Sequence, residues 1–209
     1  MKIEDGFGLY LVMTDPVVGY AKCAEAAVRC GVRFVQLRMK NASASEILKE
    51  AREVRAVTRG TGTLFILNDD PELAVKCEAD GVHLGQGDMP LRLAMARFSM
   101  LKIFGLSTHN LGQVKAACEF TPDYIGVGPV YATPTKAIPD PTLGVEGAAE
   151  MIKAAPCPAV AIGGINSENL PNVKRAGARN FSVVRAVCQN NDPKSAIRRL
   201  QEIWATQNL

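Results

Sequence analysis

The strongest constraint on the fold is a regular alternation of short apolar runs with amphipathic stretches along the chain. Between the runs, residues 44–58, 111–119 and 195–204 repeat apolar side chains every three or four positions, as amphipathic helices do. Repeated strand–helix units predict an α/β fold, a closed (β/α)8 barrel (TIM barrel), with residues 1–209 as a single domain. The eight runs with strand character are 9–13, 33–37, 64–67, 81–84, 103–106, 124–127, 159–162 and 181–184.

An open, doubly wound sheet is the alternative architecture. It would need fewer strands and a glycine-rich turn after the first strand, and no such turn follows Met13. Glycines such as Gly31 and Gly177 stand between a helical stretch and the next strand, where helices commonly end. The barrel is therefore favoured.

Composition restricts the possible partners and the compartment. The net charge is only +3, from 24 basic and 21 acidic residues, so neither nucleic acid nor a membrane surface is an expected partner. The six cysteines are widely spaced without a C-x-x-C pair, which is typical of a reduced, cytoplasmic protein. The apolar run at 9–13 is too short for a signal peptide or a membrane span. A homo-oligomer remains open.

Carboxylates follow two neighbouring strands of the expected barrel. Asp69 and Asp88 come after the third and fourth runs, and in a parallel barrel the carboxyl ends of the strands meet at one face. Carboxylate oxygens suit Mg²⁺, which completes its shell with water and phosphate oxygens. The alternative is a helix N-cap, which is preferred for Asp70 because Pro71 follows it. We predict Mg²⁺ binding by Asp69 and Asp88.

Basic side chains follow the second strand. Arg38 and Lys40 alternate with apolar residues and are expected to face the barrel mouth together with Gln36. A guanidinium and an ammonium group would form a clamp for a diphosphate. A solvated strand end is the alternative, but Lys136 on the far side favours the clamp, and Asn68 could bind a phosphate oxygen beside the metal.

A second anion site is predicted after the seventh and eighth strands. Gly163-Gly164 and Val184-Arg185 stand where barrels often bind phosphate through backbone N–H groups. A tight turn is the alternative for the glycine pair. The segment 131–147 is long and irregular, so we expect it to be a substrate loop or lid.

Two anion sites imply two phosphorylated substrates. His83 lies within an apolar strand and is expected to be structural, whereas His109 is nearer the mouth and could contact substrate or transfer a proton. No serine or cysteine has the context of an activated nucleophile, so covalent catalysis is not predicted.

The joint occurrence of five motifs resembles the thiamine-phosphate synthase family over residues 9–187. The motifs are QLRMK (36–40), NDD (68–70), HLGQGD (83–88), GPVYATPTK (128–136) and GGI (163–165). The resemblance implies a transferase of thiamine biosynthesis that joins a hydroxymethylpyrimidine diphosphate to a thiazole phosphate and releases diphosphate. It implies a dissociative mechanism, in which diphosphate departs before the thiazole nitrogen captures a pyrimidinylmethyl cation.

The resemblance also assigns roles to individual residues. Asp69 and Asp88 would hold Mg²⁺, and Arg38, Lys40, Ser107 and Lys136 would be catalytic. The pyrimidine diphosphate would contact Gln36, Arg38, Lys40, Asn68, Ser107 and Lys136. The thiazole phosphate would contact Thr133, Pro134, Thr135, Gly164, Val184 and Arg185.

One residue departs from the family pattern, because Arg185 stands where the family commonly has serine. Its backbone amide could serve equally, and its guanidinium could add a contact to phosphate. Two alternative functions stay open. One is a thiazole tautomerase-like isomerase using His109, and the other is a non-catalytic barrel that binds thiazole phosphate.

Overall fold

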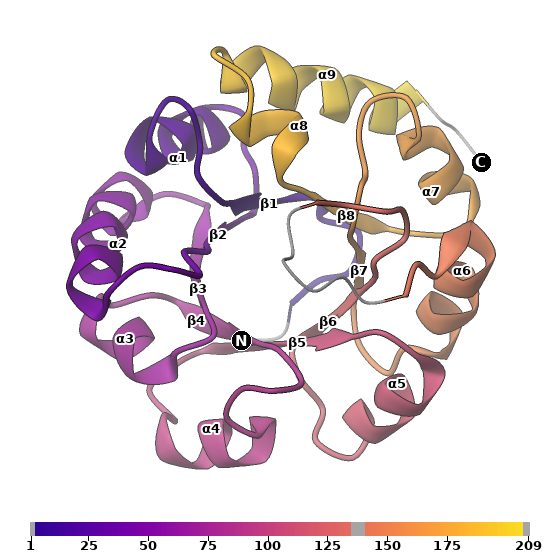
Figure 1. Cartoon of the computed structure of the whole chain (residues 1–209), viewed down its shortest axis with the longest axis horizontal. Helices are drawn as coiled ribbons and strands as arrows, with labels where there is room; N and C mark the ends of the chain where they lie inside the picture. Colours follow the sequence, from indigo (N-terminus) through magenta and orange to yellow (C-terminus); the bar gives the residue numbers. More distant parts are fainter. Residues whose placement is uncertain (1–2, 135–140, 207–209) are drawn as a thin grey trace.

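Eight parallel strands close into a barrel in the computed structural model, which describes residues 3–134 and 141–206. Each strand pairs with the next one along the chain, and β1 pairs with β8 to complete the ring (Figure 1). The predicted (β/α)8 barrel is confirmed, and the doubly wound sheet is wrong. The strands are β1 (Gly8–Met13), β2 (Phe34–Leu37), β3 (Leu64–Asn68), β4 (Gly81–Leu84), β5 (Ile103–Thr108), β6 (Tyr124–Val127), β7 (Ala159–Ala161) and β8 (Asn180–Val183).

The helices form an outer ring around the strands (Figure 1). Helix α2 begins with a capping box, because the Ser43 side chain accepts the Glu46 N–H and the Glu46 carboxylate accepts the Ser43 N–H. It covers the range predicted from the apolar periodicity. The helices are α1 (Tyr20–Arg29), α2 (Ala44–Thr58), α3 (Pro71–Lys76), α4 (Leu91–Arg97), α5 (Leu111–Ala117), α6 (Gly144–Ala154), α7 (Leu170–Arg175), α8 (Arg185–Cys188) and α9 (Pro193–Thr206).

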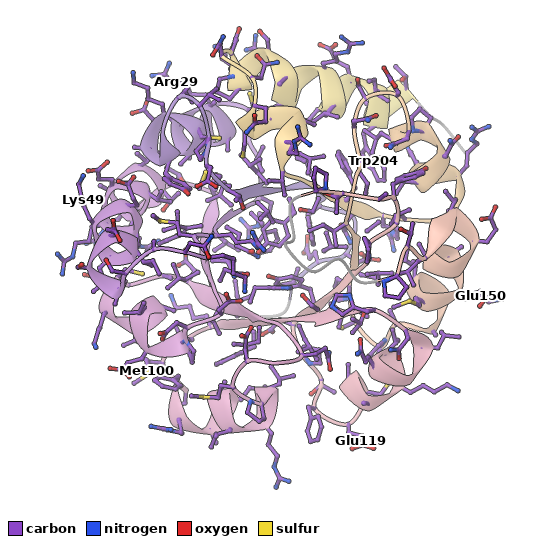
Figure 2. All side chains as sticks on the ribbon, in the orientation of Figure 1. Arg29, Lys49, Met100, Glu119, Glu150 and Trp204 are labelled. Carbon is purple, nitrogen blue, oxygen red and sulfur yellow. The ribbon has the colours of Figure 1, made fainter. Side chains whose placement is uncertain are left out.

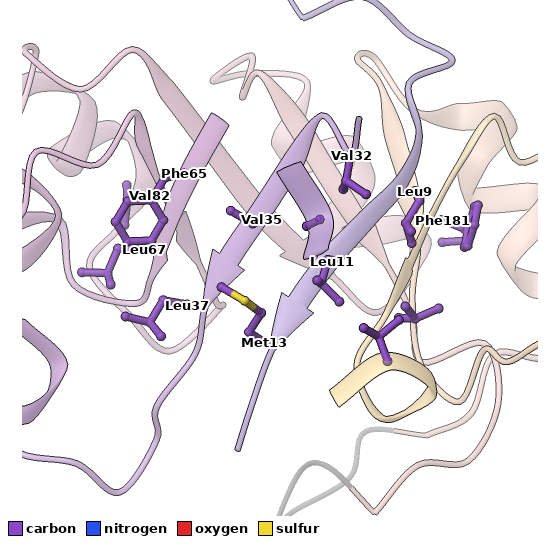
Figure 3. Packing of buried hydrophobic residues seen from close by; sticks show 14 of the residues in the cluster. Leu9, Leu11, Met13, Val32, Val35, Leu37, Phe65, Leu67, Val82 and Phe181 are labelled. Carbon is purple, nitrogen blue, oxygen red and sulfur yellow. The ribbon is translucent and has the colours of Figure 1, made fainter. Parts of the chain in front are cut away.

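Strand alternation separates two hydrophobic clusters. Leu9, Leu11 and Met13 on β1 point outward into the layer between strands and helices, where Val35 and Leu37 of β2 join them (Figure 3). The residues between them point into the barrel, and the inner cluster is smaller: Ile3, Tyr10, Val12, Phe34, Ile66, Ile103, Tyr124 and Val160. Because each fully buried large apolar side chain contributes about 1.5–3 kcal/mol, the outer layer supplies most of the hydrophobic stabilisation.

The outer rim of the helical ring carries charged side chains. Arg29, Lys49, Glu119 and Glu150 are exposed and extend from the outer rim of the helical ring (Figure 2). Within the described residues, none of the helices has the length and apolar content needed to cross a membrane.

Several expected boundaries differ from the structure by one to a few residues, and two of these differences concern the predicted site. Strand β5 continues to Thr108, so Ser107 lies inside a strand and not after it. The Thr108 hydroxyl donates to the Gly126 carbonyl at 2.9 Å, which lets polar residues continue the strand. Helix α6 begins at Gly144, so the irregular segment that follows Tyr131 ends earlier than the predicted residue, Gly147. Its residues 135–140 lie outside the described part of the chain.

At the amino ends of the strands, aspartates hold neighbouring strands together. The Asp80 carboxylate accepts the Phe65 N–H at 2.9 Å and a guanidinium hydrogen of Arg55 at 3.0 Å. The Asp123 carboxylate accepts the Phe104 N–H at 2.8 Å in the same way. Each bond ties the start of a strand to the residue that precedes the next strand, so these carboxylates support the barrel at the face opposite the predicted site.

We expect Asp80→Asn to lower the free energy of unfolding by about 1–3 kcal/mol, because hydrogen bonds to a mostly buried charged group are lost or weakened. Urea unfolding followed by circular dichroism would measure the loss. Glu78→Gln is the matched control, since Glu78 and its partner Arg59 are 69% and 60% exposed and an exposed ion pair contributes about 0–1 kcal/mol. Equal effects in the two variants would contradict this role for Asp80.

Candidate active site

A cavity of about 540 Å³ opens at the carboxyl ends of the strands. Its volume lies within the range of about 300–1,000 Å³ that small-molecule sites occupy. Eleven of the residues to which the resemblance assigns a binding or catalytic role contribute to its lining, although they come from most of the barrel. They are Gln36, Arg38, Lys40, Asn68, Asp69, Ser107, Thr133, Pro134, Gly164, Val184 and Arg185.

The cationic side of the cavity follows β2. The Arg38 N–H donates to the Met13 carbonyl at 3.0 Å, so pairing with β1 continues one residue beyond the strand. Burial lowers the pKa of Arg38, while the carboxylates of Asp69 and Asp15 oppose this shift. A guanidinium is among the strongest bases in proteins, so it stays charged at neutral pH despite this shift. Lys40 lies beside it, with Nζ 2.5 Å from Oδ2 of Asp69.

Asp69 and Asp88 come close together next to these cations. Burial raises the pKa of Asp69, the Asp88 carboxylate raises it further, and Lys40 opposes both effects. The Asp88 side chain accepts the Gly85 N–H at 2.7 Å and does not cap helix α4, which begins after Pro90. Asp70 has the predicted capping role, because its side chain accepts the N–H of the fourth residue of its turn, Leu73, at 2.9 Å.

The backbone at Asp69 is strained. Its φ of 69° lies in the left-handed region, which costs a residue other than glycine about 1–3 kcal/mol. The Asp69 N–H donates to the His83 carbonyl at 2.8 Å and so helps to hold this conformation. Such strain, together with a carboxylate pair, is typical of a site whose geometry serves a ligand.

This carboxylate pair suits a hard divalent cation. Two nearby carboxylates repel one another, and a cation between them would relieve the repulsion that raises the pKa of Asp69. In residues 3–134 and 141–206, no group of three or more acidic, histidine or cysteine side chains is arranged to hold a metal. Hard divalent cations are often bound by one or two protein carboxylates, with water and substrate oxygens in the other positions.

The opposite side of the cavity has closely approaching backbone segments. Gly163 and Gly164 have φ values of 105° and 64°, and a Cβ on Gly164 would lie 2.7 Å from the Ala132 carbonyl oxygen. Glycine is therefore required for the β7 loop to lie against the loop that follows β6. Arg185 is exposed and begins helix α8, directly after Val184, and N–H groups in a first helical turn have no partner within the helix.

The loop after β6 is described only in part. Thr133 and Pro134 line the cavity, whereas Thr135 and Lys136 lie outside the described residues. Nearby, His109 also lines the cavity. Its Nδ1 lies 2.6 Å from the Gly128 carbonyl oxygen, so this nitrogen carries the hydrogen. A proton-transfer role for His109 stays a prediction.

Sequence reasoning missed the polar groups inside the barrel. Tyr10, Tyr124 and Ser182 line the floor of the cavity, as does His83, which was expected to be structural. The His83 Nε2 lies 2.9 Å from the Ser107 hydroxyl. Burial raises the pKa of Tyr10 and of Tyr124, so both phenols stay protonated. The sequence does contain a signal for these residues, because each of them alternates along its strand with neighbours that face outward.

The comparison with known proteins agrees with the geometry. A family model described as thiamine monophosphate synthase matches residues 9–187. A thiamine-phosphate synthase of Synechococcus sp. (strain WH7803) is 44% identical over 179 residues, covering 86% of this chain. One from Syntrophomonas wolfei is 36% identical over 205 residues, covering 97% of this chain and 98% of that protein. The chain spans 50% of the length of the Synechococcus relative.

Among solved structures, thiamine phosphate pyrophosphorylase from Pyrococcus furiosus is similar over nearly the whole chain. The two chains superpose with a TM-score of 0.86 at 30% identity, covering 95% of this chain and 96% of that one. The chain belongs to the thiamine monophosphate synthase family.

Proposed function

We propose that this protein is a thiamine-phosphate synthase, a transferase acting in thiamine biosynthesis. It would join 4-amino-5-hydroxymethyl-2-methylpyrimidine diphosphate to 4-methyl-5-(2-phosphoethyl)thiazole, giving thiamine phosphate and diphosphate. Membership of the family supports this assignment. The observation that carries it is one cavity with two chemically different sides, the charged side at Arg38, Lys40 and Asp69 and the backbone side at Gly164 and Arg185.

The charged side suits the diphosphate. Arg38 offers a planar fork to phosphate oxygens and Lys40 a compact charge, and Asn68 lines the cavity beside Asp69. Lys136 would add a second ammonium from the loop after β6. Gln36 and Ser107 lie deeper in the barrel and would bind the pyrimidine ring.

The backbone side suits the thiazole phosphate. Gly164 lets the chain approach closely, and the amides of Val184 and Arg185 begin helix α8. Thr133 and Pro134, with Thr135, would cover the ligand from the loop after β6. In this proposal the thiazole ring lies between the two anions, next to the pyrimidine.

The proposed chemistry needs no protein nucleophile. As the bond to diphosphate breaks, negative charge grows on the leaving oxygens, and Arg38 and Lys40 stabilise that charge from fixed positions. The inner wall is largely apolar, with Val12, Val160 and Ile162 around the floor, and it excludes water from the pyrimidinylmethyl cation. The thiazole nitrogen then captures the cation.

Magnesium is the proposed cofactor, and Asp69 and Asp88 are the residues that would hold it. Bound there, it would neutralise charge on the diphosphate oxygens. The raised pKa of Asp69, caused by burial and by the Asp88 carboxylate, supports a cation at this position.

A cytoplasmic location follows from the same proposal, because the six cysteines are free thiols, as is usual in a reducing compartment. The rival tautomerase function would leave Arg38, Lys40 and the two aspartates without a task. Measuring diphosphate release with both substrates and Mg²⁺ separates the candidates. An isomerase or a binding protein would release none, and that result would refute the proposal.

Asp69→Asn and Asp88→Asn should each lower turnover by at least about 100-fold, because charge stabilisation of several kcal/mol is lost. Asparagine tolerates a left-handed conformation, so the fold should be unchanged at Asp69. Steady-state kinetics would be measured together with Mn²⁺ binding by electron paramagnetic resonance. Asp70→Asn is the matched control, since asparagine also caps helices. Normal Mn²⁺ affinity in both variants would contradict the metal assignment.

Arg38→Ala should lower kcat strongly and leave the KM for thiazole phosphate nearly unchanged, because its charge matters most as the leaving group departs. Lys136→Ala should behave in the same way. Arg33→Ala at the opposite end of β2 is the control, since Arg33 donates to the Gly62 carbonyl at 2.8 Å, far from the mouth. A higher KM for the thiazole with unaltered kcat would overturn the assignment of Arg38.

Arg185→Ser should weaken thiazole phosphate binding by about 1–3 kcal/mol if its guanidinium reaches the phosphate, since a charged hydrogen bond is lost. Binding of the pyrimidine diphosphate should hardly change. If only the backbone amide binds the phosphate, Arg185→Ser will leave the affinity for thiazole phosphate unchanged. Gly164→Val will then lower that affinity, because its Cβ would crowd Ala132. Isothermal titration with each substrate distinguishes these outcomes. Equal, severe loss for both substrates in Arg185→Ser would refute both versions.

A further inference from the structure

A continuous chain of hydrogen bonds crosses the interior of the barrel beneath the cavity. The Gln36 amide donates to the Tyr10 hydroxyl at 2.9 Å, and the Tyr10 and Tyr124 hydroxyls lie 2.8 Å apart. The Tyr124 hydroxyl lies 3.0 Å from Nδ1 of His83, and Nε2 of His83 lies 2.9 Å from the Ser107 hydroxyl. Five residues on five strands thus link Gln36 to Ser107, the two polar groups that would meet the pyrimidine.

We propose that Tyr10, Tyr124 and His83 are positioning residues, which fix the orientation of the Ser107 hydroxyl and the Gln36 amide before substrate binds. None of the three was assigned a role from the sequence. They would act through Ser107 and Gln36, so this inference rests on the proposed function of the same site.

The donor at one end sets the direction of every hydrogen bond in this series. The Gln36 nitrogen can only donate, so the Tyr10 oxygen accepts from it and the Tyr10 hydrogen points to Tyr124. Within the described residues, the Tyr10 hydroxyl bonds only to Gln36 and Tyr124, and a reversed Tyr10–Tyr124 bond would leave a buried hydrogen unpaired, which is costly.

The same direction then passes through the imidazole. Tyr124 donates its hydrogen to Nδ1 of His83, so the neutral ring carries its hydrogen on Nε2. That hydrogen is donated to the Ser107 oxygen, and the Ser107 hydrogen is left to point into the cavity. Gln36 keeps its carbonyl oxygen for the ligand. The site therefore presents one acceptor and one donor, which complement an aminopyrimidine that has an amino hydrogen next to a ring nitrogen.

The residues around these hydrogen bonds leave room for them and hold the rings in place. A Cβ on Gly105 would lie 2.2 Å from Cζ of Tyr124 and 2.6 Å from Nδ1 of His83, so only glycine leaves room for their hydrogen bond. The His83 and Tyr124 rings stack at 5.5 Å with an interplanar angle of 25°. The Tyr10 ring contacts the Tyr124 ring edge-on at 5.5 Å. Packing and hydrogen bonding hold the same rings in place.

The position of the His83 hydrogen tests the direction without any substrate. The protein has two histidines, so nitrogen-15 NMR of histidine-labelled protein at mildly alkaline pH gives two imidazole patterns. His109 serves as the internal reference, because its Nδ1–H faces the Gly128 carbonyl. We expect the His83 hydrogen on Nε2. A hydrogen on Nδ1, or on both nitrogens, would overturn the proposed direction.

Tyr124→Phe tests the effect on binding, because it removes the link and leaves the ring packing in place. We expect kcat/KM for the pyrimidine diphosphate to fall by about ten-fold, the equivalent of one hydrogen bond. The KM for thiazole phosphate should be unchanged, and His83 should lose its single hydrogen position in the NMR spectrum. Unchanged kinetics, or an equal rise in both KM values, would refute the positioning role.

Thr63→Val is the control for a loss of stability alone. The Thr63 hydroxyl donates to the Val32 carbonyl at 2.8 Å in a buried position before β3, at the opposite end of the barrel. It should lower the free energy of unfolding without changing either KM. The kinetic test depends on the proposed function, whereas the NMR test does not. Absence of synthase activity in the unaltered protein would refute the proposed function. The direction of the hydrogen bonds would still be decided by the NMR spectrum.

Discussion

The barrel and the cavity at its mouth depend on the pairing of the first strand with the last, which closes the sheet. The register of β1 against β8 places Leu11 beside Val183, and β2 pairs along the other edge of β1. Closure leaves no free strand edge, and it gives every strand one face toward the helices and one toward the barrel axis. Residues far apart in the chain can then meet across a few ångströms, as Tyr10 and Tyr124 do.

Charges of both signs lie side by side at the barrel mouth. Lys40 lies against Asp69, and the nearby Asp88 carboxylate repels the Asp69 carboxylate. Across the cavity, Gly163 and Gly164 offer backbone in place of side-chain charge. In the proposed function, such a division would let one site discriminate between two anions, because one would be met by strong local charge and the other mainly by oriented N–H groups.

Much of this arrangement could be predicted from the sequence, because strand ends in a parallel barrel share one face. That rule alone placed Gln36, Arg38 and Asp69 at the same mouth, where the cavity now has them. It failed for Tyr124, since a tyrosine within an apolar run is indistinguishable from core until its partner on another strand is known. At Ser107 the site was expected correctly but the end of the strand was not, because satisfied polar residues extend β5 beyond the apolar run.

The glycines on the inner wall restrict how this cavity can change in evolution or by design. Gly126 and Gly128 of the β6 side already line it with the smallest possible residue, and a Cβ on Gly128 would lie 2.1 Å from the Ile162 carbonyl oxygen. Substitution on that side can therefore only obstruct the binding space. Bulkier substrates would have to be admitted by shortening side chains on other strands, such as Val12 of β1, so only part of the wall can be altered to widen the accessible substrate range.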